Sequence, residues 1–401
     1  MTVPYPTVSP TSSEGAELVA RAREIVPMLA RHAAESEQHR CLAEESLKAL
    51  TDSGMFRLLT PHRYGGYEVS LRTFLDVTST LAEGDGASSW LVSVCNSCAW
   101  MASLFPQKAQ DDVFGATRDT IVSGVVAPTA ETRRVDGGLR VSGRWYYNSG
   151  SWHADWAVVG VPITASSGEV IDQGLALVPA SDYTVEETWF VAGMSATGSN
   201  CLVAKDIFIP DHRIISVPPL IDGTHPTEHD EHSLYRSAFA PFVSTVVIGP
   251  QLGLGRAALE FVTSKASDKA IAFTFYERQS DSTAFQVDVA EAALKIDTAH
   301  LHAYRVADTI DQGAAHGQLP DHLTRARLRA DLGHVVENIG AAINLLLHVH
   351  GSAAFAESNP LQRIWRDASV AARHAVIQPS IGKEVYGKAL LGVDEKITPM
   401  L

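Results

Sequence analysis

The feature that most constrains the fold is the spacing of apolar residues, which changes twice along the chain. Up to about residue 118 they recur at helical intervals, as in EGAELVARAREIVPMLARHAAES, and Gly54 is a candidate left-handed helix end. From Thr120 the pattern alternates, and VDGG is typical of a hairpin turn between strands. Helical spacing then returns at about 234–266, 281–312, 321–350 and 360–391. These patterns predict a mainly helical α+β chain: a helical domain (1–118), a small β-barrel or sheet domain (119–215), a linker (216–233) and a four-helix bundle (234–401).

The net charge of the chain argues against two classes of binding partner, nucleic acids and membranes. The chain of 401 residues carries 32 basic and 46 acidic groups, a net charge of −14, so it has no broad basic surface for nucleic acid or anionic lipid. The N-terminus lacks the basic and apolar regions of a signal peptide, and no apolar run approaches the ~20 residues that span a bilayer. We therefore expect a soluble cytoplasmic protein that has neither a membrane nor a nucleic-acid partner.

Two short motifs have the spacing of metal or redox sites. CNSC contains Cys95 and Cys98, but it lies in a helical pattern without a second CxxC, which favours two packed thiols. The second motif is HPTEHDEH, with the ligand-type residues His225, Glu228, His229, Asp230 and His232. It follows a Pro/Gly connector, so a solvated interdomain loop is favoured and no metal site is predicted.

The stretch GPQLGLGRAALE can be read as GxGxxA at Gly253, Gly255 and Ala258. A dinucleotide fingerprint requires a strand before the first glycine, whereas Pro250 and a helical pattern stand here. We expect a helix and no nicotinamide-binding site.

Four ordered stretches resemble the acyl-CoA dehydrogenase fold, and within it the reduced-flavin-dependent two-component (group D) monooxygenases. They are LTDSGMFRLLTPHRYGGYEVSLRTFLDVTSTLAEGDGASSWL, VDGGLRVSGRWYYNSGSWHADWAVVGV, GMSATGSNCLVAKDIFIP and NPLQRIWRDASVAARHAV. The resemblance implies the oxygenase component of such a pair. It implies reduced FAD or FMN from a separate NAD(P)H:flavin reductase, O2 as co-substrate, a C4a-hydroperoxyflavin, an aromatic substrate and a homotetramer.

The branch within the family follows from a missing acid. Acyl-CoA dehydrogenases need a carboxylate base, which many members carry shortly after an Arg-Asp-Ala element. Here Arg366 and Asp367 are followed by His374 and Ala375. The other usual place for the base, near STVVIGPQLGLG, also lacks an acid. The resemblance therefore implies His374 as a catalytic residue, either as general base on the substrate O–H or N–H or as the group that holds the peroxide proton, with an ordinary imidazole pKa near 6.5 and a pH limb near neutrality.

The resemblance also assigns the flavin contacts. Ser149 follows the aromatic strand GRWYYN, and its hydroxyl is expected to contact N5 of the reduced ring and to share in catalysis. Arg278 is expected to reach the flavin phosphates of a neighbouring subunit, because a guanidinium pairs bidentately with phosphate. The full set of expected cofactor residues is Val126, Pro128, Asn148, Ser149, Gly150, Thr197, Ser199, Arg278, Gly351 and Ser352.

The substrate is less constrained than the cofactor. Expected substrate-pocket residues are Ser97, Cys98, Trp100, Trp152 and His153. Family members that act on phenols carry a histidine just before the helix tryptophan, where this chain has CNSCAW. Phenols, indoles and polycyclic aromatics therefore stay open. So do amine N-oxygenation, an FAD-dependent acyl-CoA dehydrogenase and a homologue that has lost its cofactor.

Overall fold

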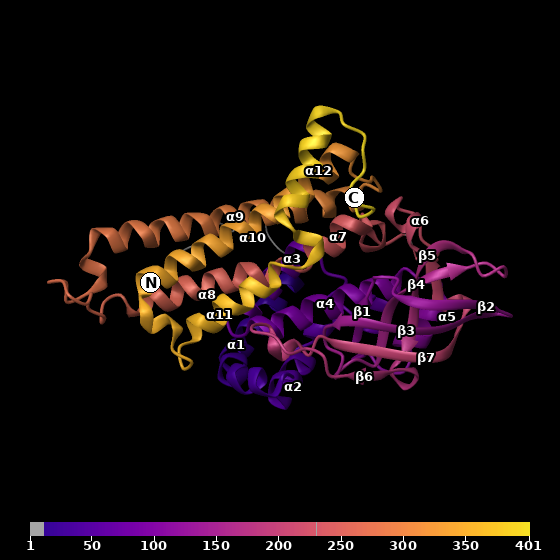
Figure 1. Cartoon of the computed structure of the whole chain (residues 1–401), viewed down its shortest axis with the longest axis horizontal. Coiled ribbons are helices and arrows are strands. Elements are labelled where there is room, and N and C mark those ends of the chain that lie inside the picture. The colour runs from indigo at the N-terminus through magenta and orange to yellow at the C-terminus, as the bar shows by residue number, and fades with distance from the viewer. Residues whose placement is uncertain (1–11, 230) are drawn as a thin grey trace.

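The computed structural model describes residues 12–229 and 231–401, and Figure 1 shows a long helical bundle on one side and a β domain on the other. The N-terminal helices connect the two. They are α1 (Ser13–His39), α2 (Glu44–Asp52), α3 (Leu71–Ala82), α4 (Gly86–Ser103) and α5 (Gln107–Phe114), with short 3-10 turns at Met55–Arg57 and His62–Tyr64.

Local capping explains where the N-terminal helices begin and end. The Asp85 carboxylate accepts a hydrogen bond from the backbone N–H of Ser88 at 2.8 Å, which fixes the first turn of α4. Ser70 caps α3 in the same way. Gly54 follows α2 with a φ of +78°, so the expectation of a left-handed residue there is confirmed.

The β domain consists of two four-stranded sheets. The first has the order β1 (Val122–Val125), β4 (Trp156–Thr164), β5 (Val170–Pro179) and β8 (Ile214–Ser216), with β1 parallel to β4. The second has the order β2 (Ala130–Val135), β3 (Gly138–Asn148), β7 (Asn200–Pro210) and β6 (Thr184–Glu186). A separate apolar core includes residues of both sheets, and Trp145 Nε1 on β3 donates to the Gly160 carbonyl on β4 at 2.8 Å. The hairpin predicted at VDGG is confirmed, because β2 and β3 pair on either side of it.

Irregularities in β3 determine what lies at its end. The pairing of β3 with β7 shifts between Trp145 and Asn148, and Tyr147 has a φ of +69°. In a regular strand, residues three positions apart face opposite sides of the sheet. Here the irregularity leaves Trp145 and Asn148 both buried, while Tyr146 and Tyr147 are exposed. Asn148 then pairs with Asn200, so the next residue, Ser149, lies opposite Ser199.

The C-terminal part is helical, as predicted, but two of the four expected segments are broken. The helices are α6 (Val217–Ile221), α7 (Phe239–Thr245), α8 (Gly249–Lys265), α9 (Thr283–Ala315), α10 (His322–His350), α11 (Pro360–Ala371) and α12 (Pro379–Leu391). The expected helix 234–266 begins with a 3-10 turn (Ser233–Arg236) and is interrupted between α7 and α8.

The expected helix 360–391 is wrong as a single element. It ends at Ala371 and restarts at Pro379, since proline disfavours helical geometry at Gln378 and lacks the N–H that a continuing helix would use. His374 lies in this break. In Figure 1, α12 projects away from the long bundle after the break.

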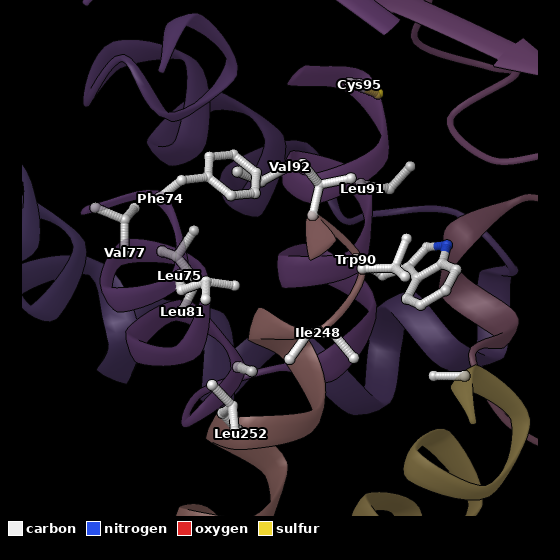
Figure 2. Packing of buried hydrophobic residues seen from close by; sticks show 14 of the residues in the cluster. Phe74, Leu75, Val77, Leu81, Trp90, Leu91, Val92, Cys95, Ile248 and Leu252 are labelled. Atoms are coloured by element: carbon white, nitrogen blue, oxygen red, sulfur yellow. The ribbon is translucent and has the colours of Figure 1, made fainter. Parts of the chain in front are cut away.

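The main core joins the N-terminal helices to the bundle. Figure 2 shows side chains of α3, α4 and α8 packed together, including Phe74, Val92 and Leu252. Gly253 lies so close to α3 that an added Cβ would stand 2.0 Å from the Ser79 carbonyl oxygen. The GxGxxA pattern is therefore a helix-packing surface, as expected.

Two stretches of the described chain are long and apolar enough to cross a bilayer by length and composition. They are Phe239–Lys265 and His322–His350, and 89% and 50% of their most apolar windows are buried inside the protein. Both stretches lie in segments predicted as helices, and by this measure the expectation that no apolar run approaches the length of a bilayer span is wrong.

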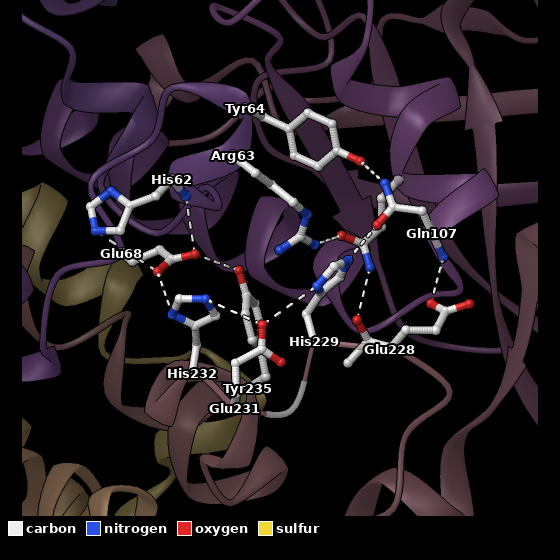
Figure 3. Close-up of polar contacts among 12 residues, drawn as sticks. His62, Arg63, Tyr64, Glu68, Gln107, Glu228, His229, Glu231, His232 and Tyr235 are labelled. Atoms are coloured by element: carbon white, nitrogen blue, oxygen red, sulfur yellow. Dashed lines mark hydrogen bonds and ion pairs between the residues drawn. The ribbon is translucent and has the colours of Figure 1, made fainter.

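The His-rich linker is a loop that forms hydrogen bonds and an ion pair with the N-terminal part of the chain, as Figure 3 shows. The Gln107 backbone N–H donates to Glu228 at 2.8 Å, and the Tyr235 hydroxyl donates to Glu68 at 2.7 Å. His232 also lies 3.5 Å from the Glu68 carboxylate. No group of three or more potential metal ligands occurs in 12–229 or 231–401, and Asp230 lies outside the described residues.

The two CNSC thiols are packed in α4, as expected. Cys95 and Cys98 are buried and free, and burial raises the pKa of Cys95 to about 12 and that of Cys98 well above its ordinary value. Both thiols therefore stay neutral. The proposed domain boundary at 118 falls between α5 and β1, whereas those at 215 and 233 fall inside β8 and inside the 3-10 turn Ser233–Arg236; the division into domains stays a prediction.

Candidate active site

Trp90 lies where the three parts of the chain meet. It stands in the second turn of α4, and Figure 2 shows its ring nitrogen turned away from the packed aliphatic side chains. That nitrogen donates to Ser149 Oγ at the end of β3, at 3.1 Å. The indole ring also meets the His374 ring edge-on, with centroids 5.6 Å apart and planes at 62°. One residue of the N-terminal part thus contacts both catalytic candidates.

A row of buried hydroxyl groups continues from Ser149. Ser149 Oγ lies 2.7 Å from Ser199 Oγ, and Ser199 Oγ lies 2.7 Å from Thr197 Oγ1. Thr197 Oγ1 donates to the Met194 carbonyl at 2.8 Å. All three hydroxyl groups are on residues at most 5% exposed, so water does not compete for these bonds. We call Ser149, Ser199 and Thr197 the hydroxyl row.

The groups at the end of β3 have hydrogen-bonding capacity left for a ligand. The side-chain nitrogen and oxygen of Asn148 are both buried, and neither has a partner among the described residues. Such an amide costs free energy unless a ligand or water pairs with it. Ser149 Oγ accepts one bond from Trp90 and shares one with Ser199, which leaves it one further hydrogen-bonding position, either a lone pair or its hydrogen. These unused groups fit a planar ligand with polar edges, such as a flavin.

Gly150 allows α4 to approach this strand end. Its φ is +77°, and an added Cβ would lie 3.0 Å from Leu91 and 3.2 Å from Cys95. Val126 is half-buried at the end of β1 and Pro128 is exposed in the following loop. Within one chain, the expected cofactor residues 126, 128, 148–150, 197 and 199 all belong to the β domain.

His374 lies in the break between α11 and α12 and is partly exposed. Its backbone N–H donates to the Ala371 carbonyl at 3.1 Å, and more than a third of its surface is open to solvent. The ring packs edge-on against Trp90, and desolvation by the surrounding protein, together with the positive charge of Arg329, lowers the pKa of His374 to about 4. The expected pKa near 6.5 is therefore wrong, and the imidazole is neutral at neutral pH.

Three expected cofactor residues lie elsewhere. Arg278 is exposed in the loop before α9 and pairs with Asp281 at 3.0 Å. Gly351 and Ser352 are exposed just after α10. Gln279 joins these two segments by a hydrogen bond to the Val349 carbonyl at 2.8 Å. Figure 1 shows this end of the bundle on the side away from the β domain.

The expected substrate residues do not form one pocket in the single chain. Trp100 is fully buried, stacks on Phe242 with centroids 3.9 Å apart, and donates its N–H to the Leu234 carbonyl at 3.0 Å. Ser97 and Cys98 are buried on α4, and Cys98 Sγ faces Gly124 of β1. Trp100 thus acts in packing, whereas Cys98 lies against the β domain.

Trp152 and His153 lie at a separate recess on the surface. His153 Nε2 is 3.3 Å from Cys41 Sγ, and burial lowers the pKa of His153. A cavity of about 360 Å³ opens beside Trp152, lined by His39, Arg40, Cys41, Trp152, Glu187, Trp189, Phe190 and Asn200. Its lining residues do not include Ser149 or His374.

Trp90 is not among the site residues predicted from the sequence. Its only local signal is its place near the start of a capped helix, and its role depends on contacts with Ser149 and His374, which are 59 and 284 positions away in the sequence.

Comparison with known proteins gives the family. The family model described as acyl-CoA dehydrogenase, N-terminal domain, matches residues 12–114, and the one described as acyl-CoA dehydrogenase, C-terminal domain, matches 245–379. The oxygenase subunit HsaA of a flavin-dependent monooxygenase from Rhodococcus jostii is 32% identical over 93% of this chain and 98% of its own length. Indole-3-acetate monooxygenase from Pseudomonas putida is 29% identical over 88% and 90%.

The solved structures agree with these matches. XiaF from Streptomyces, in complex with FADH2 and glycerol, superposes with a TM-score of 0.92 at 37% identity and covers 97% of this chain and 98% of that one. By sequence and by fold, the chain belongs to the flavin-dependent monooxygenases of the acyl-CoA dehydrogenase fold, as an oxygenase component.

Proposed function

We propose that this chain uses reduced flavin and O2 to hydroxylate a neutral aromatic substrate at the junction of Trp90, Ser149 and His374. The observation that carries the proposal is the contact of Trp90 with both other residues. It places a hydrogen-bond acceptor and a neutral base on two sides of one indole ring. A bound reduced flavin supplies the two electrons that activate O2.

The roles of the residues follow from their chemistry. Ser149 would accept a hydrogen bond from the flavin N5 edge, and Asn148 would pair with a polar edge of the ring through its unpaired amide. His374, neutral at neutral pH, would accept a proton from the substrate O–H or N–H.

The proposed substrate is neutral because the described groups beside Ser97 on α4 are neutral. Burial keeps Cys95 and Cys98 protonated, and this part of α4 carries no histidine that could hold a phenolate. Indoles and uncharged polycyclic aromatics fit this environment better than phenolates. The relatives include an indole-3-acetate monooxygenase, which is consistent with this choice.

We also propose a soluble cytoplasmic homotetramer in which each flavin is held by two chains. Arg278, Gly351 and Ser352 lie at the end of the bundle away from the β domain (Figure 1). A flavin at Ser149 would meet these residues only from a second copy of the chain. The reduced flavin itself would come from a separate NAD(P)H-dependent reductase.

The test is oxygen transfer with isotope labelling. Purified protein, reduced FAD or FMN and ¹⁸O2 are mixed with indole, with an uncharged polycyclic aromatic and with a simple phenol. We expect one ¹⁸O atom in the product of one of the first two substrates, detected by mass spectrometry. Anaerobic oxidation of an acyl-CoA with an artificial acceptor would contradict the proposal. An N-oxide from an amine substrate would support N-oxygenation in its place.

A further inference from the structure

We propose that the hydroxyl row makes Ser149 a hydrogen-bond acceptor, and that Thr197 and Ser199 thereby select reduced over oxidised flavin without touching the ring. The sequence analysis assigned Thr197 and Ser199 to direct cofactor contact. Their geometry assigns them a positioning role. The inference rests on the proposed place of Ser149 beside flavin N5.

The direction of the row follows from counting hydrogens. Each hydroxyl group has one hydrogen to donate. Thr197 Oγ1 donates its hydrogen to the Met194 carbonyl at 2.8 Å, so it can only accept from Ser199. Ser199 has then used its hydrogen and must accept from Ser149. Ser149 consequently donates inward, and its remaining lone pair faces outward beside the bond from Trp90.

The opposite order is possible but leaves one hydrogen unused in the free protein. Thr197 would donate to Ser199, Ser199 would donate to Ser149, and the Ser149 hydrogen would point outward; among the described residues Ser149 Oγ has hydrogen bonds only to Trp90 and Ser199, so this hydrogen would be unused. The Met194 carbonyl would still accept from Trp189 Nε1 at 2.9 Å. The inward order therefore makes one more hydrogen bond, and in a buried row each bond matters.

The two redox states of a flavin differ at the atom that Ser149 would meet. N5 of the reduced ring carries a hydrogen and donates, whereas N5 of the oxidised ring accepts. The inward order of the row matches the reduced ring. For Ser149 to donate to oxidised flavin, the hydrogen bonds of all three hydroxyl groups would have to reverse direction, and the bond from Thr197 to the Met194 carbonyl would be lost. The protein is thus expected to bind the reduced cofactor more tightly and to release it after oxidation.

Two substitutions should reverse the direction of the hydrogen bonds in the hydroxyl row while Ser149 itself is unchanged. Thr197→Val has nearly the same shape but cannot accept from Ser199, so Ser199 turns toward Ser149 and the Ser149 hydrogen points outward. Ser199→Ala removes the inner acceptor directly, with the same consequence. Thr197→Ser keeps the row intact and shows whether the methyl group matters. Ser151→Ala is the matched control, because the Ser151 hydroxyl is equally buried but donates to the Gly198 carbonyl at 2.7 Å, outside the row.

The experiment measures dissociation constants for oxidised and for reduced FAD, the latter under anaerobic conditions, in each purified full-length variant. One neutral hydrogen bond corresponds to about a two- to tenfold change. In Thr197→Val and Ser199→Ala we expect the preference for reduced flavin to fall by that factor, with oxidised flavin bound more tightly. The midpoint potential of bound flavin should drop by up to about 30 mV, since tenfold equals that shift for two electrons. Thr197→Ser and Ser151→Ala should match the wild type.

The possible results distinguish failure of the positioning role of Thr197 and Ser199 from failure of the proposed flavin-dependent function. Equal changes in both dissociation constants would mean that Thr197 and Ser199 act only in packing, and would overturn the inference. The same holds if Ser149→Ala shifts the preference while both row variants do not. If the wild type binds neither form of flavin, the proposed function fails as well. Thermal melting identifies any variant that does not fold, and the two row variants are independent of each other.

Discussion

Substitution of His374 is the most direct test of the proposed chemistry. A residue that takes a proton in the reaction contributes about 10²- to 10⁴-fold to rate, so His374→Ala should reduce product formation by at least 100-fold. Reduced flavin should still bind, and oxygen should still be consumed, with hydrogen peroxide released in place of product. His374→Gln keeps a hydrogen-bonding group but no base, so it should resemble His374→Ala.

The structure also specifies the pH dependence. A base must be neutral to act, and desolvation, together with the charge of Arg329, lowers the pKa of His374 to about 4. At pH 5.5 about 97% of such an imidazole is neutral, compared with about 9% at an ordinary pKa of 6.5. Coupled hydroxylation should therefore persist at pH 5.5 and be lost only as the pH falls toward 4. The neutral limb that the sequence alone suggests is not expected.

The assay is the ratio of hydroxylated product to hydrogen peroxide in single turnovers from about pH 3.5 to pH 8, with the fold checked at the acid end. His316→Ala serves as a control, because His316 lies exposed at the end of α9. A wild-type limb centred near pH 6.5 that disappears in His374→Ala would refute the low pKa but retain the base. Unchanged coupling with lowered thermal stability would show that His374 has a packing role only.

Three further predictions concern coupling, cofactor binding and stability. Ser149→Ala should leave the fold intact and raise the fraction of oxygen lost as hydrogen peroxide several-fold, since one hydrogen bond is worth about 1 kcal/mol; an unaltered ratio would remove Ser149 from the site. Arg278→Ala should weaken reduced-flavin binding about tenfold or more, measured by anaerobic titration, with partial recovery in Arg278→Lys; light scattering that gives a monomer would contradict the shared site behind this expectation. His300 is fully buried, and burial lowers its pKa from 6.5 to about 4. Between these two pH values only the unfolded chain binds a proton at this imidazole, so the free energy of unfolding should fall by about 3 kcal/mol as the pH drops from above 6.5 to below 4. Since Asp367, with a pKa raised to about 7, has the opposite sign, the measurement is the difference in urea unfolding between wild type and His300→Gln, and equal pH slopes would refute it.

Local patterns in the sequence predicted most of the fold because the responsible forces are local. Helical spacing, the VDGG turn and Gly54 each act within a few residues, and the structure has each of them. The break at 372–378 also had a local signal, the Gln378-Pro379 pair, which the periodicity test does not weigh. Short strands such as β6 and β8 were missed, because three residues carry no measurable period.

The candidate site depends on pairings that no local pattern gives. Ser149 and Ser199 meet because β3 and β7 are antiparallel neighbours and a bulge restores their register. Trp90 reaches both Ser149 and His374 only after α4 packs between the β domain and the bundle. The lowered pKa of His374 likewise results from the protein around it. Family resemblance supplied the residues, but only the assembled chain gives the order of their hydrogen bonds.

The charges around the site argue against acyl-CoA oxidation by this chain. Removing an α-proton requires an exposed carboxylate beside the substrate, and the acid that precedes His374 on α11 is Asp367. Its carboxylate accepts the backbone N–H of Met194 and is only 5% exposed, and burial raises its pKa to about 7. Asp367 therefore connects the bundle to the β domain through this hydrogen bond. An acyl thioester could not reach its carboxylate unless this contact were broken. Trp90, Ser149 and His374 are all neutral at neutral pH, which suits transfer of an oxygen atom to an uncharged ring. If Asp367→Asn kept the fold but abolished an anaerobic acyl-CoA oxidation present in the wild type, this assignment of charges would be wrong.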